Sequence, residues 1–110
     1  MNVNEYQKQA RTTAINHPDA LMDKTIWVLG IAGESGEVVE KWKKIVAYKD
    51  GIITAEDTKE LVKEMGDVIW YVDVLAKSLG VSLEDVLQMN LNKLADRKSR
   101  GVTKGAGDNR

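Results

Sequence analysis

Four carboxylates stand in two pairs with the same three-residue spacing. Glu34 and Glu37 form the first pair, and Glu64 and Asp67 form the second. Residues three apart in a helix share one face, so each pair can present two carboxylates in one direction. Oxygen ligands without histidine or cysteine suit a hard cation, Mg²⁺ first and Mn²⁺ next. The spacing therefore raises the hypothesis of a divalent-cation site.

The place of Glu34 in its expected helix strengthens this hypothesis. A helix is predicted over residues 24–48, and Glu34 falls at the centre of its apolar stripe, among Trp27, Ile31, Val38 and Ile45. Glu37 lies at the edge of the stripe. An uncompensated buried carboxylate costs several kcal/mol. A bound cation would offset that cost.

Three glycines surround the first carboxylate pair. Gly30, Gly33 and Gly36 recur every three residues. Each glycine inside a helix costs about 1 kcal/mol relative to alanine. We therefore expect a close neighbour at this helix, and we interpret the glycines as letting helices approach until four carboxylates share metal.

A third helix is predicted from the N-cap Thr54, with Asp57 three residues on, to its end at Gly80. Glu64 lies in one of its stripes, with Val68, Tyr71 and Leu75. Residues 68–76 are apolar almost all the way round, which is typical of a helix covered on several sides. In so short a chain, that coverage predicts a second subunit.

A fourth helix is predicted from Ser82 to about residue 99, with Asp85 completing a capping box. Its expected core stripe encloses Asn90 and consists of Leu83, Val86, Leu87 and Leu94. Lys93 and Arg97 follow on the side of Asn90, where cations can neutralise phosphate oxygens beyond a metal.

The remaining segments complete an expected all-α fold of four helices, a bundle completed by oligomerisation, in a single domain over residues 1–110. A weakly apolar first helix is predicted over residues 5–16, with Asn4 as N-cap, and Pro18 breaks it. Residues 101–110 are glycine-rich and aperiodic, which predicts a flexible tail.

Composition narrows the classes of partner. Sixteen basic and seventeen acidic residues give a net charge of −1, so no basic excess predicts nucleic-acid binding. No apolar run reaches membrane-spanning length, and the N-terminus lacks a signal-peptide pattern. The chain has no cysteine, which is consistent with a cytoplasmic protein.

Each carboxylate pair also has an ordinary explanation. Glu37 with Lys41, and Lys63 with Asp67, have the spacing of surface ion pairs worth a few tenths of a kcal/mol. Asn90 alone can fix helix register in a bundle. A purely structural helical oligomer with paired carboxylates is thus one alternative.

The aromatic residues also allow two interpretations, a role in nucleotide binding and a role in the core. Trp27 and Tyr71 are candidates for stacking on a nucleotide base, although such residues more often belong to a core. A di-iron carboxylate bundle fits poorly, because those proteins use Glu-x-x-His and the only histidine is His17.

Several blocks, in order along the chain, resemble the all-α MazG-type nucleoside triphosphate pyrophosphohydrolases. The family pattern E-x-x-E, a spacer and E-x-x-D matches residues 34–37 and 64–67. Further blocks match at residues 90–94, 97–101 and 105–108. The likeness covers roughly residues 24–110.

The resemblance implies Mg²⁺-dependent hydrolysis of a nucleoside triphosphate, with a deoxynucleoside triphosphate favoured, to the monophosphate and pyrophosphate. It implies that the four acidic residues bind metal, with Glu34 or Glu37 orienting or deprotonating water, and that Asn90 and Lys93 contact the nucleotide. It also implies a homodimer or homotetramer. The alternative is a nucleotide-binding regulatory module with little turnover.

The first helix matches the family only loosely. In that family, the first helix and its neighbours help to form the base pocket. Gln9, Thr13 and Trp27 are therefore candidates for it here.

Overall fold

The computed structural model describes residues 1–110 as an all-α protein, which confirms the predicted fold class. It contains four α-helices and one short 3-10 helix, η1, and no strand. The elements in chain order are α1 (Val3–Ala10), η1 (Arg11–Thr13), α2 (Ala20–Lys49), α3 (Ala55–Ser78) and α4 (Leu83–Ser99). None of these helices is both long and apolar enough to cross a membrane.

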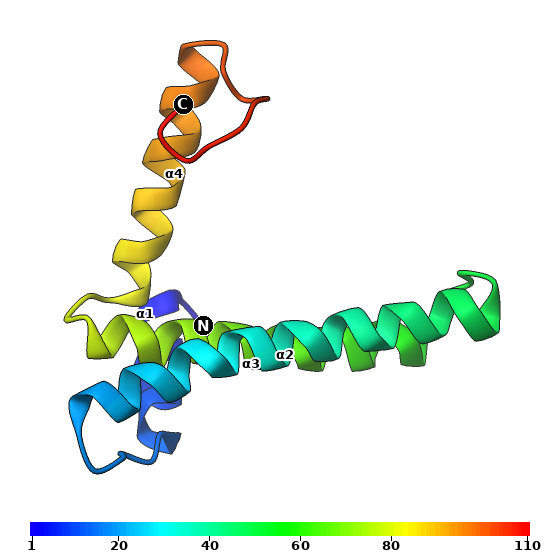
Figure 1. The fold of residues 1–110 in the computed structure, drawn as a ribbon, viewed down its shortest axis with the longest axis horizontal. Coiled ribbons are helices and arrows are strands. Elements are labelled where there is room, and N and C mark those ends of the chain that lie inside the picture. The colour runs from blue at the N-terminus through cyan, green and yellow to red at the C-terminus, as the bar shows by residue number, and fades with distance from the viewer.

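The two long helices, α2 and α3, form an antiparallel hairpin (Figure 1). Asp50 and Gly51 reverse the chain between them with φ angles of 52° and 75°. Asp50 is the C-cap of α2, and Gly51 follows it in the left-handed backbone that favours glycine at a helix end. A capping box of Thr54 and Asp57 then starts α3, as predicted.

Helix α2 starts earlier than the apolar pattern predicts. It begins at Ala20 rather than near Lys24, because the side chain of Asp19 caps it by accepting from the Met22 N–H at 2.7 Å. An aspartate N-cap satisfies a backbone donor that would otherwise lack a partner. The extra turn brings Asp23 within 2.7 Å of His17 Nδ1.

The first helix is shorter than predicted and uses another cap. Asn2, not Asn4, is the N-cap, and it forms a capping box with Glu5. The helix ends at Ala10 instead of continuing to residue 16. The hydroxyls of Thr12 and Thr13 donate to carbonyls three residues back, at 2.6 Å each, where the last turn tightens into η1.

A buried ion pair attaches this N-terminal segment to α3. Asp73 is fully buried, and its Oδ1 accepts from Arg11 Nε at 3.1 Å. The same guanidinium donates to the carbonyl of Val81 at 3.2 Å. Arg11 therefore joins η1, α3 and the connection into α4, and sequence periodicity gave no sign of this contact.

Helix α4 begins with the predicted capping box of Ser82 and Asp85, but it does not lie along the hairpin. It packs on α1 and α3 near its start and then projects away from them (Figure 1). The prediction of a core stripe is therefore wrong for most of α4 within one chain. Leu83 is buried, whereas Leu87 and Leu94 are 43% and 45% exposed, and Asn90 is exposed too.

The tail, residues 101–110, contains no helix or strand, in keeping with its lack of periodicity. It folds back on itself around Arg110, whose guanidinium donates to the carbonyls of Val102, Thr103 and Gly107. Arg100 in turn donates to the Arg110 carbonyl at 2.6 Å.

Little of the chain is buried. Only 8 of the 110 residues are buried, and the six hydrophobic ones among them are Ala10, Trp27, Ile45, Val74, Ala76 and Leu83. Most of these buried residues lie where α1 and the start of α4 meet the hairpin. Ile45 is the exception, because it lies near the turn between α2 and α3. The far part of the hairpin and most of α4 have no other element over them (Figure 1).

Candidate functional site

The hairpin brings three of the four predicted carboxylates together. One oxygen from each of Glu34, Glu64 and Asp67 can be chosen so that all lie within 4.8 Å of one another. Glu34 comes from α2, and the other two come from facing turns of α3. We call Glu34, Glu64 and Asp67 the carboxylate cluster.

Glu37 lies outside the carboxylate cluster. It is exposed, as its place at the edge of the α2 stripe predicts. Its charge still acts on the cluster, since it contributes to the raised pKa of Glu34. Glu37 is thus a neighbour of the cluster rather than a fourth member.

The carboxylate cluster concentrates negative charge. Partial burial, together with the charges of Asp67, Glu64 and Glu37, raises the pKa of the Glu34 carboxyl above its ordinary value. One cation lies beside the group, because Lys41 Nζ is 3.6 Å from Glu64 Oε1.

The ordinary ion pairs suggested by the sequence do not form. Lys41 pairs with Glu60 and Glu64 across the hairpin rather than with Glu37. Lys63 pairs with Glu60 rather than with Asp67. The expectation of local i, i+4 pairs is therefore wrong, and Asp67 has no ion-pair partner in the chain.

Only one of the three glycines beside the cluster has a close neighbour. A Cβ added to Gly30 would collide with the ring of Tyr71 on α3. A Cβ on Gly33 or Gly36 would meet nothing within 4 Å. The interpretation that all three let helices approach is correct for Gly30 and wrong for the other two within this chain.

Aromatic rings continue the site away from the carboxylates. Trp70 and Tyr71 pack edge to face with centroids 5.0 Å apart, and buried Trp27 lies 5.6 Å from Trp70. A cavity of about 330 Å³ is lined by Glu34, Asp67, Trp70 and Tyr71. Tyr71 therefore lines the same cavity as Glu34 and Asp67, whereas Trp27 lies behind Trp70.

A larger cavity lies on the other side of Trp70. It measures about 860 Å³, and its lining includes Tyr6, Gln9, Thr13 and Trp70. Trp70 Nε1 donates to Thr13 Oγ1 at 2.8 Å, which fixes the indole between the two cavities. Gln9 and Thr13 were candidates from the sequence. Trp70 was missed, although it stands next to Tyr71 in the same apolar run.

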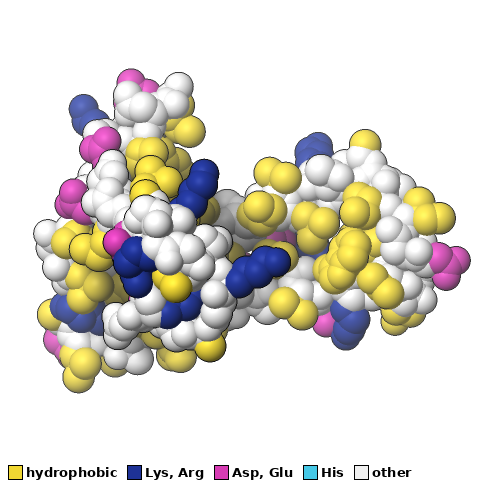
Figure 2. Space-filling view, turned by 90° about the horizontal axis from the view of Figure 1, so that it is seen from above, with side chains coloured by type: hydrophobic (Ala, Val, Ile, Leu, Met, Phe, Trp, Pro, Cys, Tyr) yellow, Lys and Arg dark blue, Asp and Glu magenta, His cyan; other side chains and the backbone are white.

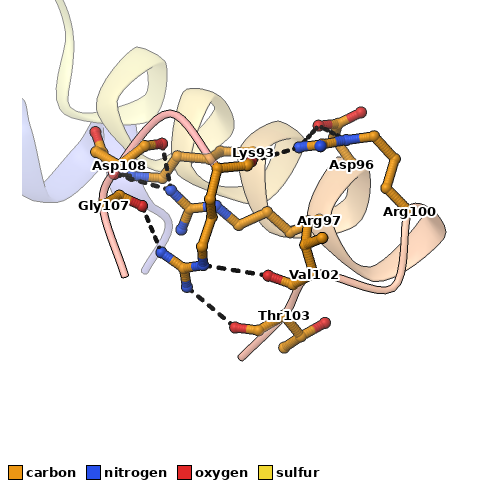
Figure 3. Close-up of polar contacts among 9 residues, drawn as sticks. Lys93, Asp96, Arg97, Arg100, Val102, Thr103, Gly107 and Asp108 are labelled. Carbon is orange, nitrogen blue, oxygen red and sulfur yellow. Dashed lines mark hydrogen bonds and ion pairs between the residues drawn. The ribbon is translucent and has the colours of Figure 1, made fainter. Parts of the chain in front are cut away.

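Two of the three predicted residues of α4, Lys93 and Arg97, form a separate cluster with Asp108 (Figure 3). Lys93 Nζ and Arg97 NH2 reach the same oxygen of Asp108, Oδ1, at 2.7 and 3.0 Å. Hydrogen bonds from these two cations lower the pKa of the Asp108 carboxyl. Arg97 is buried under the tail, while Asn90 is exposed and makes no such contact.

None of the α4 residues lines the cavity at the carboxylate cluster. The structure therefore brings together Glu34, Glu64, Asp67 and Tyr71, with Glu37 beside them. It leaves Asn90, Lys93 and Arg97 on a different element that points away (Figure 1).

These features define an all-helical protein whose antiparallel hairpin carries a carboxylate cluster beside an aromatic cavity. The family model of the MazG nucleotide pyrophosphohydrolase domain matches residues 23–102. The chain belongs to this family. The matched range contains all four predicted acidic residues and excludes α1, which lines the larger cavity.

Two relatives extend the comparison. The chain is 48% identical to the Gene 37 protein of Mycobacterium phage L5, over 115 aligned residues that span all of both chains. It is 51% identical to the uncharacterized protein YvdC of Bacillus subtilis (strain 168) over 43 residues, 39% of this chain and 41% of YvdC. No solved structure matches the chain.

Proposed function

We propose that the protein hydrolyses a nucleoside triphosphate, with a deoxynucleoside triphosphate favoured, to the monophosphate and pyrophosphate in a Mg²⁺-dependent reaction. One observation carries the proposal: three carboxylates from two helices converge on one point beside an aromatic cavity. Family membership supports this class of reaction, and the convergence of the three carboxylates supports the proposal that the reaction takes place there.

The carboxylate cluster fits a hard divalent cation. Octahedral Mg²⁺ holds its oxygen ligands 2.0–2.1 Å from the ion, which puts adjacent ligands about 2.9 Å apart and opposite ligands about 4.2 Å apart. The cluster oxygens lie within 4.8 Å of one another, so small side-chain movements bring them to such spacings. The raised pKa of Glu34 supports the same assignment, since a cation would relieve the crowding of like charges. Mn²⁺ shares this preference for oxygen ligands and is the expected substitute.

In this proposal Glu34, Glu64 and Asp67 hold the ion. When bound, the ion polarises phosphate oxygens and lowers the pKa of water. Glu37, which is exposed and outside the cluster, is free to orient the attacking water and accept its proton on a carboxylate oxygen. The water oxygen then bonds to phosphorus, and the bond from that phosphorus to the pyrophosphate oxygen breaks.

The aromatic side chains define the orientation in which a nucleotide would bind. With its phosphates at the carboxylate cluster, a nucleotide can extend along Tyr71 and Trp70 toward the larger cavity. Gln9 and Thr13 on the wall of that cavity can hydrogen-bond a base or sugar. Asn90, Lys93 and Arg97 remain candidates for phosphate contacts, in a homo-oligomer that brings them to the site.

The test resolves the products formed from each nucleoside and deoxynucleoside triphosphate with Mg²⁺. We expect monophosphate and pyrophosphate from the wild type and none from Asp67→Asn. Glu40→Gln is the matched control, because Glu40 pairs with Lys43 and Lys44 on the outer face of α2. Diphosphate with inorganic phosphate, or equal activity in Asp67→Asn, would contradict the proposal. Tight nucleotide binding without turnover would instead identify a regulatory module.

A further inference from the structure

Trp70 forms a wall shared by the two cavities of the candidate site. It lines the cavity of about 330 Å³ together with Glu34 and Asp67, and it also lines the cavity of about 860 Å³ beside α1. A nucleotide that extends from one cavity into the other therefore lies against the indole. Aromatic rings bind bases through their faces, so the plane of the indole decides how a base stacks on it.

Three contacts hold the indole of Trp70 in this plane. The ring of Trp27 packs edge-on against it with centroids 5.6 Å apart, and the ring of Tyr71 does so at 5.0 Å. The third contact is polar, because Trp70 Nε1 donates to Thr13 Oγ1 at 2.8 Å, with the Ala10 carbonyl as a longer second acceptor at 3.3 Å. The two rings restrict the indole by shape, and the hydroxyl fixes the direction of its N–H edge.

The hydroxyl of Thr13 is itself oriented. It donates its only proton to the Ala10 carbonyl at 2.6 Å, so a lone pair faces the indole N–H. The neighbouring Thr12 makes the same kind of bond, to the Gln9 carbonyl at 2.6 Å, but its hydroxyl makes no hydrogen bond to Trp70. The two threonines therefore form a matched pair that differs in the contact with the indole.

A buried ion pair keeps Thr13 beside Trp70. Asp73 follows Trp70 by three residues, so both side chains leave α3 on the same face. The fully buried Asp73 carboxylate accepts from Arg11 Nε at 3.1 Å, and the same guanidinium donates to the Val81 carbonyl at 3.2 Å. Separating such a pair leaves a buried charge without compensation, so the attachment of η1 to α3 resists displacement.

The attachment of η1 is polar rather than apolar. None of its three residues is buried, so the segment adds no residue to the hydrophobic core. It also leaves the far part of the hairpin uncovered, where Figure 2 shows apolar side chains at the surface. A segment kept for burial would cover such side chains. Instead, η1 contacts one indole and one carboxylate through hydrogen bonds.

We propose that Thr13 is a positioning residue for the nucleotide base: the Arg11–Asp73 pair holds it against α3, and its hydroxyl fixes the indole of Trp70 as the stacking surface. Thr13 acts through Trp70 and does not touch the carboxylate cluster. Loss of the hydroxyl lets the indole turn, which weakens binding of the base without changing the reaction at phosphorus. The presence of a nucleotide in the cavities rests on the proposed function, whereas the attachment of Trp70 to Thr13 does not.

The first test compares Thr13→Val with Thr13→Ser. Valine has the shape of threonine without the hydroxyl, and serine keeps the hydroxyl. Thr13→Val should raise KM for the preferred triphosphate by about tenfold and leave kcat within about twofold, because base stacking contributes to binding by roughly that factor. Thr13→Ser should restore the wild-type KM. Inorganic tripolyphosphate, which has no base, should inhibit all three proteins equally.

Several results of these kinetics would overturn the proposal. They are an unchanged KM in Thr13→Val, a loss of kcat at constant KM, and no rescue by Thr13→Ser. Weaker inhibition of Thr13→Val by tripolyphosphate would also overturn it, because the hydroxyl would then act on the phosphate end of the site.

The second test does not depend on turnover. The chain has three tryptophans, and a proton–nitrogen NMR spectrum shows one indole N–H signal for each. Trp70→Phe identifies the Trp70 signal by its loss. Thr13→Val should shift that signal and speed its exchange with solvent by about fivefold or more, because the N–H loses its shorter hydrogen bond. Thr12→Val should change neither. An unchanged Trp70 signal in Thr13→Val would overturn the proposal even if KM rises.

The role of the ion pair is tested by combining substitutions. Arg11→Lys replaces the planar guanidinium with a single ammonium, so η1 should loosen and KM should rise as in Thr13→Val. Adding Thr13→Val to Arg11→Lys should raise KM by less than about a further twofold, because both changes act through the same indole. An unchanged KM in Arg11→Lys, or effects that multiply, would contradict this role. If the wild type neither binds nor hydrolyses nucleotides, the proposed function fails, while the NMR comparison still decides whether Thr13 positions Trp70.

Discussion

Glu34 in the hairpin and Asp108 in the tail are both carboxylates, but their surroundings shift their pKa values in opposite directions. Partial burial and three acidic neighbours raise the pKa of Glu34. Hydrogen bonds from Lys93 and Arg97 lower the pKa of Asp108. The hairpin therefore gathers charges of one sign, and α4 with the tail pairs charges of opposite sign.

This difference separates a group of charges that needs a counter-charge from a group that already contains one. Opposite charges in contact stabilise each other, so the cluster around Asp108 needs no ligand to explain it. Like charges in contact destabilise the fold unless something of the other sign binds. The hairpin keeps such charges on its inner stripe, where Glu34 lies between Ile31 and Val38. The cost is explained if the carboxylate cluster binds a cation.

Replacing one carboxylate in the hairpin and one in the tail with its amide should give the largest difference in turnover. Glu64→Gln should lower turnover by at least about a hundredfold, the usual loss when a charge-stabilising group is removed from an active site. Asp108→Asn should change it by less than about tenfold. Steady-state kinetics with saturating Mg²⁺ measures both. Equal losses in the two variants would erase the distinction between the regions.

Packing around the cluster should respond strongly to one added methyl group. Gly30→Ala forces a Cβ into the Tyr71 ring and should destabilise the fold by about 1–3 kcal/mol. Gly33→Ala is the matched control, because it adds its Cβ in open space and should stabilise α2 by up to about 1 kcal/mol. Urea denaturation compares the two variants. Destabilisation by Gly33→Ala would mean that another surface covers that glycine.

Replacing the central carboxylate should separate stability from activity. Glu34→Leu removes a like charge and continues the apolar stripe of α2, so it should stabilise the metal-free protein by about 1–2 kcal/mol. Turnover should be lost in the same variant. Thermal unfolding in EDTA measures the first effect as a rise of about 4–8 °C per kcal/mol. A clear loss of stability would refute the view that Glu34 is kept at a structural cost.

The smallest expected effect is on the pH dependence of unfolding. Because the folded-state pKa of Glu34 is raised, stability should fall as pH rises through the ordinary pKa to the raised one, and Glu34→Gln should remove that loss. Because the pKa of Asp108 is lowered, its contribution is present above the ordinary pKa and disappears as pH falls through the lowered one. Asp108→Asn should therefore cost stability at neutral pH and nothing in strong acid. Thermal scans in EDTA from acid to neutral pH measure both, and slopes of the same sign would contradict the contrast.

The sequence predicted what depends on local chemistry. The starts of α3 and α4 follow from capping boxes at Thr54 and Ser82, where side chain and backbone satisfy each other within one turn. The first helix was misplaced because Asn2 and Asn4 both have an acceptable partner three residues on. Local rules do not choose between two such caps. The convergence of Glu34, Glu64 and Asp67 was predictable because Glu34 and Glu64 lie in apolar stripes of their helices and Asp67 follows Glu64 by three residues, on the same face.

Contacts between segments that are distant in the chain could not be predicted from the sequence patterns. Periodicity tells which face of α4 is apolar but not where the helix points, so it does not distinguish a stripe buried within the chain from one left exposed. The pairing of Arg11 with Asp73 joins residues 62 apart and leaves no trace in spacing. The exposed stripe of α2 is different, because Val39, Trp42 and Val46 repeat at spacings of three and four residues that are visible in the sequence.

The most direct measurement is a calorimetric titration of Mg²⁺ into the nucleotide-free protein and its cluster variants. We expect binding by the wild type, and by Glu40→Gln as a control for charge alone. Binding should be lost in Glu64→Gln and in Asp67→Asn. Equal binding in all four proteins, or none by the wild type, would contradict the claim that these carboxylates form a metal site.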